Sequence, residues 1–350
     1  MMVTGPTLIQ KKAKDYYFIT RTAQIVMAAF FACLILVFSD SILGNLSNWD
    51  SNLSVPLATT VLTFLFQDYV RRELFSKDQT LYGVLIDILC YGSRLIILFI
   101  YAFNDHLDVY TTLVIISVTS AFSFIFFINR SLFFAKPDNS SLSSAITIHW
   151  NNGKWLLLNT LSIWLSSQLI LYMTGFMLTT GDVGMLVATQ NILGFANILF
   201  QAMENFVPSQ ASKTYSSSGI TKLNQYLKRI TLIGGTGTLL IILIICIFSR
   251  QLLDLVYSDY QDAYWLVWFW GLYFLMGFFR RPLTAGLRVL NDTKSIFIAS
   301  TLGAFFTIII GYILILRYGI TGTMISLCLV QLIILLTLFY NYNIKSKQTG

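Results

Sequence analysis

Long apolar segments alternate with short polar segments along the whole chain. Each apolar segment is long enough for a helix to cross a hydrocarbon layer about 30 Å thick. Apolar residues follow one another continuously instead of alternating with polar ones, which favours helices over the strands of a barrel. The fold class that we predict is an all-α, polytopic transmembrane bundle. Its ten expected spans are residues 17–43, 54–75, 80–103, 109–134, 153–178, 183–207, 226–249, 261–287, 293–316 and 320–342.

Composition agrees with this pattern. Of the 350 residues, 56% are hydrophobic and only 11% are charged, whereas a soluble domain has about 25% charged residues. The four cysteines all lie inside expected spans and lack the spacing of metal sites or disulfide frameworks. No phosphate-binding loop and no catalytic-triad spacing is recognisable, so we expect no metal, no cofactor and no enzymatic activity.

The net charge of +7 follows the membrane topology. If the N-terminus is cytoplasmic, the Lys and Arg residues gather on the cytoplasmic side, except for Arg94, Arg250 and Arg317. The opposite loops are acidic, as the positive-inside rule requires. Ten crossings then place both termini in the cytoplasm, and the basic charge gives no reason to expect a nucleic-acid partner.

The segment "AKPDNSSLSSAITIHWNN", residues 135–152, is the longest polar connection of the chain. It separates four expected spans from six. We therefore predict an N-terminal bundle over residues 1–144 and a C-terminal six-helix bundle over residues 145–350. Two half-structures joined by such a linker are typical of transporters built from repeated bundles.

Three stretches resemble the bacterial polysaccharide and O-antigen flippases: "DYVRRELFSKDQTLYGVLIDIL" (68–89), "GDVGMLVATQNILGFANILFQAMENFVPSQASK" (181–213), and "RRPLTAGLRVLNDTKSIFIASTLGAFF" with the following "RYGITGTMISL". These proteins share one exporter superfamily with the multidrug exporters and the lipid II flippases. Its members have two six-helix bundles around a central cavity. The resemblance begins at the third helix of that pattern, and it implies that the N-terminal bundle lacks its first two helices.

The resemblance implies flipping of a polyprenyl-pyrophosphate-linked oligosaccharide across the bacterial cytoplasmic membrane by alternating access. The implied partners are this lipid-linked oligosaccharide, membrane lipid, and the polymerase and glycosyltransferase machinery of O-antigen or lipopolysaccharide biosynthesis. Two alternatives remain. One is a small-molecule or cation antiporter of the multidrug type, and the other is a truncated remnant that transports nothing.

A charged residue interrupts the third span. In "DILCYGSRLIILFIY" (87–101), Asp87, Tyr91, Arg94 and Tyr101 share one helix face. Arg94 lies about 20 Å along the axis from the start of the span, and an arginine at that depth costs at least about 2.5–3.5 kcal/mol. We expect Arg94, with Asp87 and Tyr91, to line a wet cavity and bind an anionic substrate. The alternative is an ion pair, between Asp87 and Arg94 or between helices, that only joins helices.

The sixth span carries a longer polar stripe at spacings of three and four. It consists of Gln190, Gly194, Asn197, Gln201, Glu204 and Pro208. We expect Asn197, Gln201 and Glu204 to line the same cavity, with the two amides bonding sugar hydroxyls. Hydrogen bonds between helices are the alternative. The fifth span has a weaker polar face, which we expect to pack against other helices; it consists of Asn159, Ser162 and Ser166.

Two arginine pairs lie near the cytoplasmic ends of spans. They are Arg71 and Arg72, and Arg280 and Arg281. Each pair either anchors the topology or contacts a pyrophosphate, whose oxygens match a bidentate guanidinium. The spacing allows Asp68 to pair with Arg71 and Arg72. Asp68, Asp87 and Glu204 are the candidates for carrying a coupling proton or sodium ion.

Overall fold

The computed structural model describes residues 10–43, 50–124 and 139–349, and over these residues the chain forms helices and no strand. The chain divides into two compact units, residues 1–147 and 148–350. Six helical stretches in the described part are long and apolar enough to cross a membrane, judged by length and composition. The predicted all-α bundle of membrane helices is confirmed.

The first unit is built on α2, which packs against both α1 and α5. The third expected span is one helical stretch with a π-helical turn in it, and α5 covers residues 109–121 of the fourth. The elements are α1 (Gln10–Leu43), a 3₁₀ turn η2 (Ser51–Leu53), α2 (Ser54–Ser76), α3 (Thr80–Asp87), the π-helix η3 (Ile88–Gly92), α4 (Ser93–Phe103) and α5 (Val109–Ala121).

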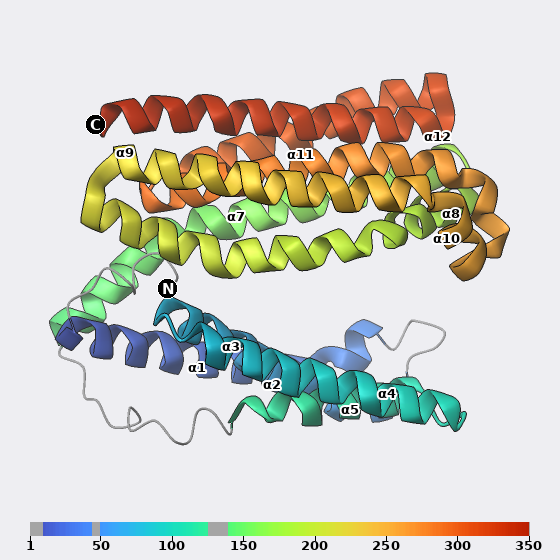
Figure 1. The fold of residues 1–350 in the computed structure, drawn as a ribbon. Helices are drawn as coiled ribbons and strands as arrows, with labels where there is room; N and C mark the ends of the chain where they lie inside the picture. Colours follow the sequence, from blue (N-terminus) through green and yellow to red (C-terminus); the bar gives the residue numbers. More distant parts are fainter. Residues whose placement is uncertain (1–9, 44–49, 125–138, 350) are drawn as a thin grey trace. The chain divides into compact units, whose positions relative to one another are not determined.

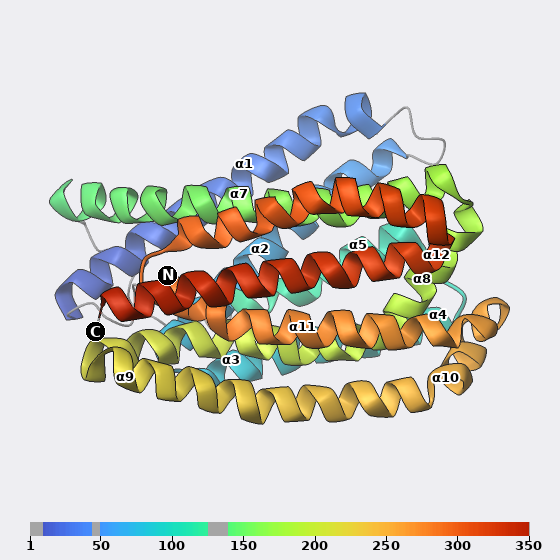
Figure 2. The same cartoon turned by 90° about the horizontal axis from the view of Figure 1, so that it is seen from above.

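The second unit is a bundle in which two long elements each fold back on themselves (Figures 1 and 2). The reversal in α9 lies at Gly219, with φ of 73°, and that in α12 at Gly319, with φ of 58°. Glycine adopts positive φ without the steric cost that a Cβ brings. The elements are α7 (Asn139–Met177), α8 (Thr180–Ile192), the 3₁₀ turn η4 (Leu193–Phe195), α9 (Ala196–Ile247), α10 (Ser249–Val256), the 3₁₀ turn η5 (Ser258–Ala263), α11 (Tyr264–Val289) and α12 (Thr293–Gln348).

Side-chain caps fix several helix starts outside the apolar spans. Asp108 and Thr111 form a capping box at the start of α5, and Thr179 and Asp182 form another at the start of α8. Each box satisfies backbone N–H groups that the first turn of a helix leaves open. Hydrogen bonds from the Thr111 hydroxyl and backbone N–H lower the pKa of Asp108.

Each unit has its own apolar core, while many large apolar side chains point outward. Phe66 stacks on Phe124 in the first unit, with ring centroids 4.1 Å apart, and α11 supplies Trp270 and Phe278 to the core of the second. Outward-facing side chains such as Leu95 would be costly in water but suit contact with lipid.

The polar connection is shorter than predicted. Of residues 135–152, Asn139 onward is already part of α7, so the prediction of a connection over this second part was wrong. A Pro-Asp-Asn-Ser sequence is a helix start signal, and the apolar residues that follow continue directly into the fifth span. Residues 135–138 lie outside the described residues, as do residues 125–134 at the end of the fourth expected span.

Hydrogen bonds between hydroxyl and amide groups join α7 to α12. Ser300 donates to Asn159 over 2.6 Å, and the hydroxyls of Ser166 and Thr307 lie 2.8 Å apart. These bonds satisfy polar groups that lipid would not. The expectation that the polar face of the fifth span packs against another helix is confirmed.

Gly322→Ala is expected to destabilise the second unit by about 2 kcal/mol. An added Cβ at Gly322 would lie 1.9 Å from the backbone oxygen of Leu314, and backbone atoms cannot move away unless the α12 hairpin opens. Thermal unfolding in detergent measures this loss. Gly153→Ala is the matched control, because a Cβ there meets no atom within 4 Å; equal stability of the two variants would contradict the prediction.

Candidate substrate-binding sites

Arg94, at the start of α4, is held by neutral groups. Its Nε donates to Thr119 Oγ1 over 3.2 Å, and its Nη2 donates to Ser120 Oγ over 2.8 Å and to Gln67 Oε1 over 3.4 Å. The guanidinium carbon lies 4.9 Å from the centre of the Tyr91 ring. Within the described residues, no carboxylate forms an ion pair with Arg94, so its charge is solvated by dipoles and a ring face.

The π-helix explains why Arg94 and Asp87 have different partners. Residues Ile88–Gly92 have a wider turn than an α-helix, whereas the predicted shared face assumed a continuous α-helix. Asp87 lies beside Arg71 of α2, with 3.8 Å between Oδ1 and Nη1. The alternative of an Asp87–Arg94 ion pair is therefore wrong. Single π-turns inside α-helices occur frequently at functional sites.

Arg71 and Arg72, the first arginine pair, form ion pairs with a carboxylate of the same helix. Asp68 accepts from Arg71 Nη2 over 2.6 Å and from Arg72 Nε over 2.7 Å, as the spacing predicts. Arg71 is largely buried, and Arg72 has 51% of its side chain exposed. Two carboxylates near Arg71 leave it poorly suited to a phosphate. Its role as a phosphate contact, and the ion-coupling roles of Asp68 and Asp87, remain predictions.

A second ionic cluster joins α1 to α2. Glu73 accepts from Arg21 over 2.6 Å and also pairs with Lys77. The side chains of Arg21 and Glu73 are only 6% and 7% exposed. Beside this cluster, the hydroxyls of Tyr17 in α1 and Ser76 in α2 form a hydrogen bond over 2.9 Å. The buried Glu73 carboxylate pairs with two cations, and this arrangement is suited to holding α1 and α2 together.

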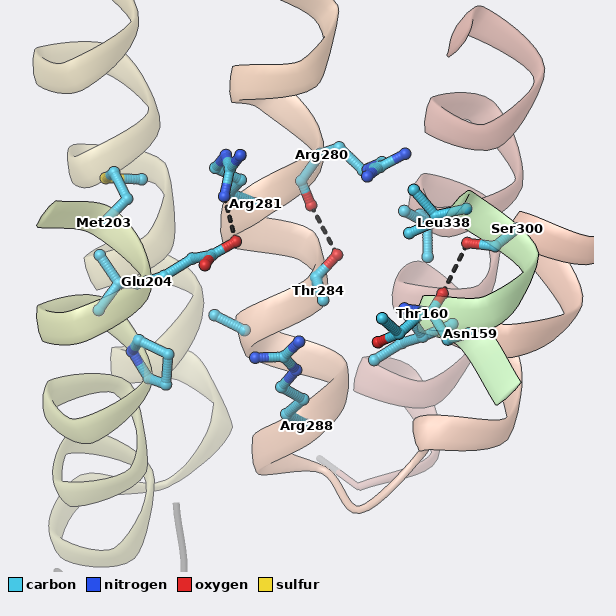
Figure 3. Close-up of a pocket in the computed structure, with 15 residues that line it drawn as sticks. Asn159, Thr160, Met203, Glu204, Arg280, Arg281, Thr284, Arg288, Ser300 and Leu338 are labelled. Carbon is cyan, nitrogen blue, oxygen red and sulfur yellow. Dashed lines mark hydrogen bonds and ion pairs between the residues drawn. The ribbon is translucent and has the colours of Figure 1, made fainter. Parts of the chain in front are cut away.

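The second unit contains a pocket of about 250 Å³ lined by three arginines of α11 (Figure 3). They are Arg280, Arg281 and Arg288. The opposite walls come from α7, α9 and α12, whose polar contributions are Asn159, Thr160, Glu204 and Ser300. Figure 3 shows Arg281 and Glu204 directed toward one another across the pocket, and Arg280 directed away from this pair.

Charge in this pocket is only partly compensated. Arg281 pairs with Glu204, and its guanidinium lies 4.2 Å from the centre of the Phe200 ring. Arg280 donates to the neutral Gln331 Oε1 over 3.3 Å. Arg280 and Arg281 therefore share the pocket with Glu204, the one carboxylate among its described lining residues, and 56% of the Glu204 side chain is exposed. This excess of positive charge favours an anionic ligand.

The residues of the predicted polar stripe on the sixth span lie in different surroundings. Glu204 lines the arginine pocket, whereas Asn197 and Gln201 are exposed on α9 and are not among its lining residues. Gly194 lies in the 3₁₀ turn η4, between α8 and α9. Binding of sugar hydroxyls by the two amides remains a prediction.

Sequence reasoning missed Arg288 and Thr284 as pocket residues. Arg280, Thr284 and Arg288 recur at intervals of four, which places them on one face of a helix. That spacing was a usable signal, but Arg288 also fits the positive-inside pattern and was assigned to topology alone. Asn159 was predicted to pack against another helix and Ser300 was not singled out, because only tertiary packing brings these two residues to the α11 pocket.

The described residues contain no group of three or more His, Cys, Asp or Glu side chains that could hold a metal ion. Arg94 and the arginine pocket of α11 can each bind and release an anion. Both lie in surroundings of low polarity, where a guanidinium attracts an anion more strongly than it does in water. Fork-shaped donors suit phosphate and carboxylate groups.

Solved structures of several membrane transporters have folds similar to that of this chain. A mutant of the Vibrio cholerae MATE transporter VcmN has a TM-score of 0.88 at 15% identity, over 100% of this chain and 84% of the other. An outward-facing multidrug resistance MATE transporter of the MOP superfamily has a TM-score of 0.82 at 15% identity, over 97% and 80%. A MOP superfamily transporter from Pyrococcus furiosus, described as having a binding pocket of reversed polarity, has 0.80 at 14%, over 97% and 80%.

No family model and no curated protein matches the sequence. At these identities, the similarity to solved structures establishes the fold alone, which is of the MATE type. It does not single out the polysaccharide and O-antigen flippases, which the sequence resemblance had named.

Proposed function

We propose that this protein is a multi-pass membrane transporter that works by alternating access and carries small organic anions. The fold supports transport, because its solved neighbours are described as transporters. In such folds two rigid bundles rock so that a binding site opens first to one side and then to the other. The observation that carries the choice of an anion is the arginine pocket of α11.

The pocket size favours a small molecule or a head group. A volume of about 250 Å³ is slightly below the range of about 300–1,000 Å³ that is usual for drug-sized ligands. The described multidrug neighbours also favour the small-molecule alternative over flipping of a lipid-linked oligosaccharide. A cation as cargo would need unpaired carboxylates, and Glu204 already has Arg281 beside it.

Flipping of a polyprenyl-pyrophosphate-linked oligosaccharide is the second candidate. Its support is the guanidinium chemistry at Arg94 and Arg280, since pyrophosphate oxygens accept bidentate hydrogen bonds. In that case the sugar, the polymerase and the glycosyltransferase machinery would be partners. A cytoplasmic-membrane location with both termini inside is part of either proposal.

Transport by the full chain in liposomes tests the choice of cargo. We expect an anionic fluorescent amphiphile to cross at least about tenfold faster than a cationic one of similar size, because hydrogen bonds to charged groups contribute about 1.5–3 kcal/mol. Equal rates, or preference for the cation, would overturn the proposal. Restored surface polysaccharide in a flippase-deficient strain would select the second candidate.

Arg280→Gln is expected to slow anion transport about tenfold, because it removes a charge whose described partner is the neutral Gln331. The matched control is Arg317→Gln, which makes the same change at an exposed position of α12 outside the pocket. Equal rates in the two variants would show that Arg280 does not contact the cargo.

A further inference from the structure

A second, apolar hollow lies on a different face of α11. It has a volume of about 590 Å³ and is lined by the second half of α9, by α11 and by the second half of α12. Phe279, Pro282 and Leu283 form its α11 wall, whereas the arginine pocket uses Arg280, Arg281 and their helix-face neighbours. We call this hollow the α9–α12 groove.

The groove opens outward between the helices. Leu232, Leu336 and Phe339 line it, yet 59%, 57% and 55% of these residues remain exposed. In a transmembrane bundle, such exposed apolar walls face lipid acyl chains, since water would make them costly. The natural content of this part of the groove is therefore hydrocarbon.

Polar side chains collect at one end of the groove. Asn224 and Lys228 lie soon after the reversal of α9, and Tyr342 and Asn343 lie near the end of α12. Tyr342 donates to Asn224 Oδ1 over 2.5 Å, which leaves the Asn224 amide N–H groups directed elsewhere. Figures 1 and 2 both show the C-terminal end of α12 beside the reversal of α9.

Charge gathers at the same end. Lys228 lines the groove and is exposed, and Arg229 next to it is exposed as well. Lys222, Lys345 and Lys347 belong to the same ends of α9 and α12. Basic residues between transmembrane helices attract anionic lipid head groups, and each Lys or Arg near a membrane surface contributes about 1 kcal/mol.

We infer that the α9–α12 groove binds an anionic phospholipid, with its phosphate at Lys228 and Asn224 and one acyl chain along Leu232, Leu336 and Phe339. The groove has the two-part chemistry of this ligand: a cationic, hydrogen-bonding end at the helix termini and an apolar channel toward the helix centres. Lys228 can bury its stem against the groove and keep its ammonium at the head group. This site is separate from the cargo pocket and does not depend on the nature of the cargo.

Native mass spectrometry of the full chain, released from detergent with equal amounts of phosphatidylglycerol and phosphatidylcholine, tests the inference. We expect phosphatidylglycerol to be retained in preference. Lys228→Ala is expected to weaken its retention about fivefold, the factor that follows from one interfacial charge. Arg250→Ala is the matched control, because it removes an exposed charge at the start of α10, beyond the far end of α9.

A second pair of variants tests the acyl channel. Leu232→Trp fills the groove and is expected to abolish preferential retention, whereas Ile233→Trp adds the same ring at a neighbouring exposed position outside the lining. Thermal unfolding of both variants verifies that they fold. Equal retention of the two lipids by the unaltered chain, or equal losses in Leu232→Trp and Ile233→Trp, would overturn the inference.

Discussion

Arg94→Gln is expected to lower transport of an anionic substrate by up to about a hundredfold, the factor that corresponds to losing hydrogen bonds to a charged group. Arg94 holds a full charge at Thr119, Ser120 and Gln67 without an ion-pair partner in the described part of the chain. A charge kept in the membrane at this cost has a functional use in most proteins. Transport of the anionic amphiphile into liposomes measures the change.

Arg94→Lys separates charge from geometry. Lysine keeps the positive charge but lacks the guanidinium fork, so its transport rate is expected between those of the unaltered chain and Arg94→Gln. Membrane insertion is followed in parallel, with Arg317→Gln as the exposed control. Unchanged transport by Arg94→Gln would mean that Arg94 serves helix packing alone. In that case, unfolding at lower temperature would be the effect of the substitution.

Glu73→Gln is expected to destabilise the first unit by about 3 kcal/mol, within the range for breaking a buried ion pair. Glu73 is shared by Arg21 and Lys77, and its side chain is 7% exposed. Without the carboxylate, two cations face a neutral amide at the junction of α1 and α2. Thermal unfolding in detergent, followed by helical circular dichroism, measures the loss.

The shared geometry also predicts an asymmetry. Arg21→Met is expected to cost less than Glu73→Gln, because Glu73 keeps Lys77 as a partner. Asp105→Asn provides the matched acid-to-amide change at an exposed position of the first unit, and we expect an effect of no more than about 0.5 kcal/mol there. If Arg21→Met destabilised the first unit more than Glu73→Gln, contacts of Arg21 other than its ion pair with Glu73 would account for its contribution to stability.

Helix positions were largely predictable because each expected span carries its own evidence. A continuous apolar run of sufficient length satisfies its backbone internally, whatever surrounds it. The errors fall where that evidence is absent. α7 begins at Asn139, within the expected connection, and α9 continues past Pro208 as far as the reversal at Gly219. The polar sequence of these two segments is compatible with a helix and with a loop, so it did not predict which of the two forms.

The candidate sites were predictable only in part. Arg94 was recognisable because a charge in an apolar run is conspicuous by itself, but its partners were not. The face shared by Asp87 and Arg94 rested on regular α-helical spacing, which the π-helix at Ile88–Gly92 breaks. Asp87 consequently contacts Arg71, which belongs to another helix, α2.

The sequence by itself determined what each segment must be: apolar helices for lipid, basic residues near the ends of several of these helices, and a few charges inside apolar runs, where they are costly. Those properties depend on local composition and on the thickness of a bilayer. Only the tertiary structure decided which charges meet, because Arg281 and Glu204 are 77 residues apart and Arg280 faces Gln331 from another helix. Such pairings depend on helix rotation and packing, and these are set by all neighbouring helices together.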